Sequence, residues 1–152
     1  MSKKKEQVKD FDLGYKVSRI NTTKFSYNDL EEDFIKNLFE NEENLKLILD
    51  VNIGISLEKS EIFFEINTSL SNKNTNENLI LHTGKTTFSL QNLSSTFSKE
   101  NEKFDLPDGL IVQLYALSYS HARALLSIEL NRTAYKDIFY LPVIDPTTIL
   151  NK

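Results

Sequence analysis

The most regular pattern in this chain is a run of apolar residues at every second position between residues 45 and 57. Seven apolar residues form the run: Leu45, Leu47, Leu49, Val51, Ile53, Ile55 and Leu57. The positions between them are mainly polar, and Ile48 is the single apolar exception. A period of two over this length puts one side of a strand on a core and the other toward solvent. The pattern therefore predicts a β-strand that is buried on one face.

The next segments predict two more strands of the same sheet. Glu58-Lys59-Ser60 favours a tight turn, and the apolar stretch 62–70 follows closely enough to form an antiparallel hairpin. The Asn-rich segment 71–78 is typical of an exposed hairpin loop. Residues 79–90 predict the third strand of a meander, with Gly84 as a bulge or bend. We expect this sheet to be covered on one face.

The segment before the alternating run predicts a strand followed by a short helix. Residues 11–27 mix aromatic and β-branched residues with Thr, Ser and Lys, which favours an extended strand with an interruption near 21–23. Asn28 is a candidate helix cap, with Glu31 as its capping-box partner. Apolar residues then recur at helical spacing: Leu30, Phe34, Ile35 and Leu38.

The C-terminal third changes to a helical pattern. Residues 91–105 are polar and predict a surface connection, after which Pro107 opens a helix at Asp108. The apolar stripe continues to about Asn131, but it weakens at 118–120, so we expect a short helix, a bend and a longer helix. The following apolar residues favour an edge strand or extended cap over 139–144. We expect no further element after Pro146. We expect residues 1–10 to be a flexible leader and 11–152 to form a single domain.

Composition and charge narrow the class of protein. Of the 152 residues, 39% are hydrophobic and 26% charged, as in ordinary folded domains. The net charge of −4 argues against a nucleic-acid binder. No segment approaches the roughly 20 apolar residues that a membrane span requires. The basic start of the chain is followed by no apolar run of a signal peptide, and there are no cysteines. We expect a cytoplasmic protein without membrane insertion.

Residues capable of chemistry are few. His82 and His121 are the only histidines, and neither has a neighbour at metal-ligand spacing. Ser118 and Ser120 flank His121 in the sequence, but adjacent helical positions point in different directions. The chain has only four glycines and no phosphate-binding loop. We expect no catalytic residues, no metal, no cofactor and no enzymatic activity.

Aromatic residues outside the regular meander need an explanation. Five phenylalanines lie in the flanking segments and the polar connection: Phe25, Phe34, Phe39, Phe97 and Phe104. They fit two roles, as plugs at the edges of the core or as walls of an apolar cleft. Such a cleft would accept non-native chains by area burial, at about 25 cal/mol per Å², together with backbone pairing at a strand edge.

A set of short motifs in the same order resembles the SecB family of protein-export chaperones. The C-terminal motifs are His121-Ala122-Arg123-Ala124-Leu125-Leu126, Asn131-Arg132-Thr133 and Phe139-Tyr140-Leu141-Pro142-Val143. The earlier ones are Ser18-Arg19-Ile20 with Phe25-Ser26-Tyr27, then Leu45-Lys46-Leu47-Ile48-Leu49-Asp50, then Gly84 with Thr87-Phe88-Ser89-Leu90. They are similar to the family's helix, turn and Leu-x-Pro-Val strand, and to the ends of its strands. The resemblance covers roughly residues 11–146.

The resemblance implies an α+β fold, a four-stranded antiparallel sheet packed against a long C-terminal helix, in a dimer or tetramer. It also implies an ATP-independent holdase that binds unfolded or precursor polypeptides in apolar grooves and delivers them to the SecA motor. The candidate groove residues are Phe25, Phe34, Phe39, Leu47, Leu49, Leu110, Leu114 and Leu141. The residues expected to pin the helix to the sheet and subunit to subunit are His121, Arg123, Leu125 and Ile128.

Three departures from the family pattern shape these expectations. Ala124 stands where the family has Glu, and Thr133-Ala134 replaces its turn glycine. The family's acidic motor-docking positions fall around Thr23-Lys24 and Asn28, which are not acidic. The family's C-terminal helix and basic tail have no counterpart after Pro146. Docking to SecA is therefore the weakest of these expectations, and a SecB-like chaperone dedicated to one partner, such as an antitoxin, fits the pattern.

A rival hypothesis comes from a different class. A small antiparallel β-barrel-like module could bind an apolar small molecule between sheet and helix. A closed cavity with one mouth would favour this rival, whereas open apolar surfaces would favour the chaperone.

Overall fold

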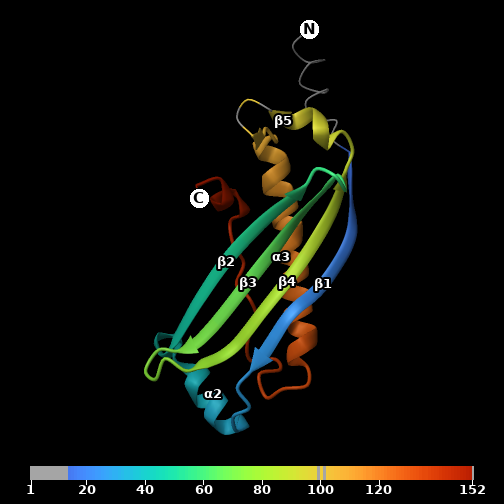
Figure 1. Ribbon diagram of the computed structural model, residues 1–152. Helices are drawn as coiled ribbons and strands as arrows, with labels where there is room; N and C mark the ends of the chain where they lie inside the picture. The colour runs from blue at the N-terminus through green and yellow to red at the C-terminus, as the bar shows by residue number, and fades with distance from the viewer. Residues whose placement is uncertain (1–13, 99, 101, 152) are drawn as a thin grey trace.

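A computed structural model of the chain describes residues 14–98, 100 and 102–151, so the expected leader lies outside the described residues. It contains a four-stranded sheet with one long helix, α3, lying across one of its faces (Figure 1). The main elements are β1 (Tyr15–Tyr27), α2 (Glu32–Glu40), β2 (Leu45–Ser56), β3 (Glu61–Asn72), β4 (Asn78–Leu90) and α3 (Asp108–Leu130). This arrangement confirms the expected α+β fold.

The four strands run antiparallel in the order β1-β4-β3-β2. The hairpins β2–β3 and β3–β4 form the predicted meander, and β1 is added beside β4. The connection through α2 carries the chain past the end of the sheet, from one edge to the other (Figure 1). Both β1 and β2 are edges, so the sheet is open and does not close into a barrel.

The core lies between the sheet and α3. Every second residue of β3, from Ile62 to Asn72, is buried, as the period of two predicts for a strand covered on one face. The helix contributes the complementary buried stripe: Leu110, Leu114, Tyr115, Ser118, Tyr119, Ala122, Leu126 and Leu130. We call the opposite side of the sheet the open face, because none of the helices in the described residues covers it (Figure 1).

Gly84 allows α3 to approach the sheet closely. A Cβ atom on Gly84 would lie 3.0 Å from the Cβ and 3.1 Å from the Cα of Ala122. The predicted bulge at Gly84 is wrong, because β4 keeps its register with β3 there. The irregularities lie in β1 instead, between Val17 and Arg19 and between Thr22 and Lys24. The second of them is close to the expected interruption near residues 21–23.

The helix α3 is continuous, so the predicted bend at 118–120 is wrong. The Ser118 hydroxyl donates a hydrogen bond to the Leu114 carbonyl, at 2.7 Å, and so satisfies its polar group inside the helix. Tyr119 is buried beside it. The polar residues in this segment therefore do not interrupt the helix.

The predicted cap of the first helix is also wrong. The residue before α2 is Glu31, which makes no side-chain capping hydrogen bond. Asn28 instead pairs with the end of the sheet, where its N–H donates to the Leu79 carbonyl at 2.8 Å. The chain therefore remains strand-like for longer than the capping pattern predicted.

Two other segments contain more structure than predicted. The connection after β4 holds a 3-10 turn, Leu93–Thr96, and a short hairpin of β5 (Phe97–Ser98) and β6 (Lys103–Phe104). The rings of Phe97 and Phe104 pack against each other there, with centroids 5.0 Å apart. The last described residues form another 3-10 helix, Pro146–Asn151, where we expected no element. It packs back on α3 through Ile149, which is buried.

The contact between Gly84 and Ala122 gives a stability prediction. Gly84→Ala should lower the free energy of unfolding by about 1–3 kcal/mol, because the added methyl group forces α3 away from the sheet. Gly109→Ala is the matched control, because Gly109 is exposed in the first turn of α3 and Ala is the better helix former. Urea unfolding of both variants measures the difference. Equal stability of Gly84→Ala and the wild type would contradict this account of the interface.

Candidate functional site

Polar side chains of α3 hold the helix to the sheet and to the C-terminal segment. His121 Nδ1 lies 3.0 Å from the Thr86 hydroxyl on β4, which ties the helix to the sheet. Arg123 Nε donates to the Leu141 carbonyl at 3.2 Å, and the Tyr119 hydroxyl donates to the Pro142 carbonyl at 2.6 Å. The two bonds hold the extended segment 139–145 along α3. Of the four residues expected to pin helix and subunits, His121 and Arg123 thus make contacts within the chain.

The other two residues of that set point away from the core. Leu125 is half-buried, and Ile128 is 63% exposed near the end of α3. Neither makes the kind of directed contact that His121 and Arg123 make. Their expected role between subunits stays a prediction.

The two serines next to His121 in the sequence do not pair with its ring, whose Nδ1 lies by the Thr86 hydroxyl. The Ser118 hydroxyl is already bonded to the Leu114 carbonyl, and Ser120 is exposed. Within residues 14–98, 100 and 102–151, no three His, Cys, Asp or Glu side chains gather as a metal-binding group. The hydrogen bonds of His121 and Ser118 therefore hold the helix and the sheet in place.

His82 lies in the interior between sheet and helix. Its side chain is 1% exposed, and Nε2 lies 3.0 Å from the Thr22 hydroxyl on β1. Its Nδ1 has no hydrogen-bond partner among the described residues, and the same holds for the hydroxyl of Thr68, its cross-strand neighbour on β3. Burial lowers the pKa of His82 to about 4, because a charged imidazolium cannot be solvated there. The ring is therefore neutral at neutral pH.

The candidate groove residues divide into buried and accessible ones. Leu110, Leu114 and Leu141 are at most 8% exposed and belong to the core, so a partner could not reach them in this structure. The accessible residues are Phe34, which is 51% exposed on α2, and Leu47, which is 36% exposed on β2. The half-buried residues are Phe25, Phe39 and Leu49.

Aromatic rings connect the end of β1 and the helix α2 to the segment that follows α3. Phe25 stacks on Tyr27 at 5.6 Å between ring centroids, and Tyr27 meets Tyr135 edge-on at 6.4 Å. Phe39 meets both Tyr135 and Phe139 edge-on, at 6.0 and 6.1 Å. Phe25 and Phe39 therefore belong to one aromatic cluster, as the plug role expects. Phe34 lies outside this set of ring contacts.

An accessible apolar surface lies on β2. Five residues on the side of β2 that faces α3 form what we call the β2 strip: Leu47, Leu49, Val51, Ile53 and Ile55. The sequence predicted this face as core, but Leu47 is 36% and Ile53 45% exposed. The reason is the position of α3, which packs on β4, β3 and β1 and leaves β2 largely uncovered. Val51, Ile53 and Ile55 were missed as surface residues, although the alternating pattern identified them as one face.

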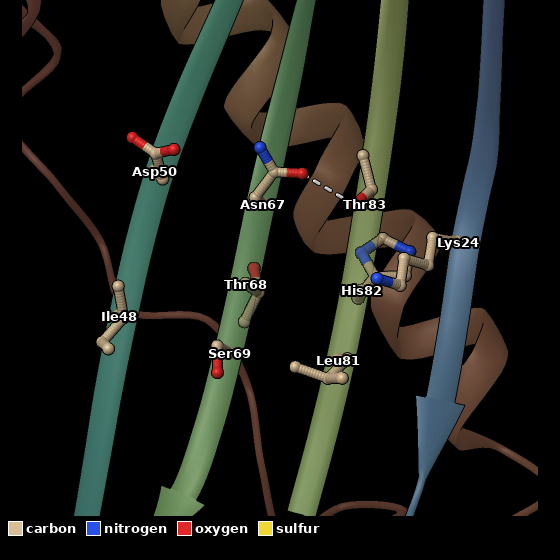
Figure 2. A pocket seen from close by; sticks show the side chains of 9 residues that line it. All are labelled: Lys24, Ile48, Asp50, Asn67, Thr68, Ser69, Leu81, His82 and Thr83. Atoms are coloured by element: carbon tan, nitrogen blue, oxygen red, sulfur yellow. Dashed lines mark hydrogen bonds between the residues drawn. The ribbon is translucent and has the colours of Figure 1, made fainter. Parts of the chain in front are cut away.

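A shallow depression of about 260 Å³ lies on the open face (Figure 2). Lys24 and Asp50 stand at its two sides, and Ile48 and Leu81 give it apolar walls. A second hollow of about 120 Å³ lies between α3 and the C-terminal segment, beside Arg123. Both are too shallow to enclose a small molecule as a binding pocket does.

Comparison with known proteins finds a likeness in structure and none in sequence. No protein-family model matches the chain, and no curated protein matches it either. The helices of the described part include none that is both long and apolar enough to cross a membrane. Among solved structures, nine chains match.

One of these solved structures is the SecB-like chaperone Rv1957 of Mycobacterium tuberculosis, in complex with a ChAD peptide from the antitoxin HigA1. The two chains superpose with a TM-score of 0.50 at 11% sequence identity. The match covers 86% of this chain and 90% of the other. The likeness shows that this protein has a SecB-like fold.

Burial of His82 predicts a dependence of stability on pH. The ring titrates near 6.5 in the unfolded chain and near 4 in the folded protein, so below pH 6.5 the unfolded state binds more protons. The free energy of unfolding should therefore fall between pH 6.5 and 4, by an amount on the order of 2 kcal/mol. His82→Gln should flatten this slope, which urea unfolding across the pH range measures. A slope that His82→Gln leaves unchanged would show that other groups cause the acid sensitivity.

Proposed function

We propose that this protein is an ATP-independent holdase chaperone that binds unfolded polypeptide segments along the β2 strip. The observation that supports this most is the partial exposure of Leu47, Ile53 and their neighbours on an edge strand, which pairs on one side only. A contiguous exposed apolar surface on a soluble protein marks an interaction site more often than an accident of packing. The SecB-like fold agrees with such a role.

The two edges of the sheet, β1 and β2, differ in how readily a strand of another chain can pair with them. The β1 edge has two irregularities and carries Lys16, Arg19 and Lys24, which are features that protect natural edges against pairing. The β2 edge pairs with β3 over twelve consecutive positions without a bulge. Its outer N–H and C=O groups can therefore align with an extended segment of another chain.

The energy for binding comes from apolar side chains at alternate positions of the client. Each such side chain gains roughly 1.5–3 kcal/mol on full burial, and a partly covering surface supplies less than this. Several contacts along the β2 strip together suit weak and reversible binding with little sequence readout. The proposed binding uses no nucleotide, and the sequence carries no glycine-rich phosphate-binding loop.

The partner is a polypeptide that exposes apolar residues. The solved complex of Rv1957 with an antitoxin peptide supports a polypeptide partner, and it favours a single dedicated client such as an antitoxin. Delivery to SecA and a role in protein export are the less favoured form of the proposal, since Thr23 and Lys24 are not acidic. A cytoplasmic location and a homo-oligomeric state belong to the same proposal, which includes no catalytic activity.

An aggregation assay tests the proposal. The wild type should suppress light scattering of a reduced, unfolded client at near-stoichiometric amounts without nucleotide. The double variant Leu47→Asn/Ile53→Asn should require several-fold more protein for the same suppression, because it removes apolar area from the β2 strip.

Leu150→Asn is the matched control, because Leu150 is 43% exposed but lies in the C-terminal 3-10 helix. It should suppress aggregation like the wild type. A wild type that leaves the scattering unchanged would refute the chaperone proposal. Equal activity of the double variant and the control would refute the assignment to the β2 strip.

A further inference from the structure

The half of the open face that β1 and β4 form is basic. These two strands contain four lysine or arginine residues and no aspartate or glutamate. The four cations are Lys16, Arg19, Lys24 and Lys85, and we call them the cation ladder. The whole chain has a net charge of −4, so the ladder concentrates positive charge against the overall balance of the protein.

The three cations of β1 share one face because the strand is irregular on both sides of Arg19. Arg19 stands three residues after Lys16 and five before Lys24, so in a regular strand it would point to the opposite face from both. The two register shifts of β1, one before and one after Arg19, reverse this orientation. Ser18 is the extra residue at the first shift, and its hydroxyl donates to the Thr87 carbonyl at 3.1 Å. All three cations therefore lie on the open face.

The ladder has a regular spacing along β4. Lys16, Arg19 and Lys24 lie level with Ser89, Thr87 and Thr83, and Lys85 occupies the level between the last two. One cation thus stands at every second residue of β4, which corresponds to steps of about 6.8 Å. An extended polypeptide repeats the side chains of one face with the same step. The ladder and one face of an extended chain therefore have the same repeat.

The cations of the ladder have no acidic partner among the described residues, where the structure shows no ion pair that includes any of them. Lys85 lies level with Glu65 of β3, but its ammonium lies over the Phe63 ring, 4.2 Å from the ring centroid. Lys24 is exposed beside the shallow depression (Figure 2). Protection of an edge strand accounts for cations on β1, but Lys85 lies on an interior strand, which needs no such protection.

We propose that the cation ladder binds an acidic segment of another protein, in extended form, with Asp or Glu at every second position. The carboxylates on one face of such a segment meet the four cations in turn. The segment lies over β1 and β4 and does not add to the β1 edge, because the two register shifts interrupt continuous backbone pairing there. The ladder and the β2 strip occupy opposite faces of the sheet, so this contact is independent of client binding.

The rest of the open face restricts the occupant to a narrow chain. The strands β3 and β2 carry Glu61, Glu65 and Asp50 there, and Lys46 stands apart near the beginning of β2. A wide anionic surface such as a membrane would cover these carboxylates too, and like charges would repel it. A single extended chain is about one strand spacing wide, roughly 4.8 Å, so it fits over the basic half alone.

The side chains around the ladder favour a peptide over a nucleic-acid strand. Proteins that bind single strands place aromatic rings beside their basic residues, and the bases stack on these rings. The aromatic residues of β1 are Tyr15, Phe25 and Tyr27, and all three pair with the residues of β4 that face α3. The ladder is accompanied on β1 and β4 by small polar residues such as Ser89 and Thr87. These suit the polar backbone of a peptide.

Two synthetic peptides test the spacing. The first has four glutamates separated by single serines, and the second has the same composition with the four glutamates in one block. The first should bind the wild type several-fold more tightly, because only alternate carboxylates all point to one face of an extended chain. Fluorescence anisotropy of the labelled peptides measures both affinities, and added salt should weaken the binding by screening.

Charge reversals locate the site. Arg19→Glu and Lys85→Glu should each weaken binding of the alternating peptide roughly tenfold or more. Lys46→Glu is the matched control, because it makes the same change at an exposed residue of the open face, on the opposite edge strand from β1, and it should bind like the wild type. Circular dichroism establishes that each variant folds, and the milder Arg19→Gln and Lys85→Gln should weaken binding in the same direction.

Four results would overturn the proposal. They are a wild type that does not bind the alternating peptide, equal affinity for the two peptides, a loss of binding in Lys46→Glu as large as in the ladder variants, and tighter binding of an oligothymidine with the same number of charges. The last result would assign the ladder to nucleic acid.

Discussion

The close contact between α3 and β4 is the interaction on which the rest of this structure depends. Gly84 has no side chain, so the Ala122 backbone can lie almost directly against the strand. His121, the residue before Ala122, lies by the hydroxyl of Thr86, two residues further along the same strand, and this contact also fixes the helix. The alternating residues of β3 and β4 are buried only because the helix lies there, and burial of apolar area is the main favourable term in folding.

The same contact explains why an apolar surface remains uncovered. A single helix is about 10 Å wide, whereas four strands span nearly twice that distance, so one helix cannot cover the whole sheet. Anchored on β4, α3 leaves β2 at the uncovered edge. The apolar residues of β2 therefore alternate as in a strand that faces a core, although they remain partly exposed. Stability and the proposed binding surface follow from one placement of the helix.

The sequence predicted the elements better than it predicted their exposure. The period of two between residues 45 and 57 identified β2, and the helical stripe identified α3. The spacing of apolar residues along the chain shows both the type of element and which of its sides is apolar. It could not show which strand the helix covers, so Ile53 was expected in the core. Leu110, Leu114 and Leu141 were expected at a groove for the same reason. The paired position of Asn28 and the burial of His82 are set by distant strands, which no local pattern reveals.

The two sides of the sheet differ in chemistry, and the proposed client uses only the side that faces α3. The most direct test is hydrogen exchange of the protein with and without a saturating unfolded client. Slower exchange confined to the amides of β2, with β1 unchanged, is the result that strand addition at the β2 strip predicts. Equal protection of β1 and β2, or a change located only on the open face, would contradict this account.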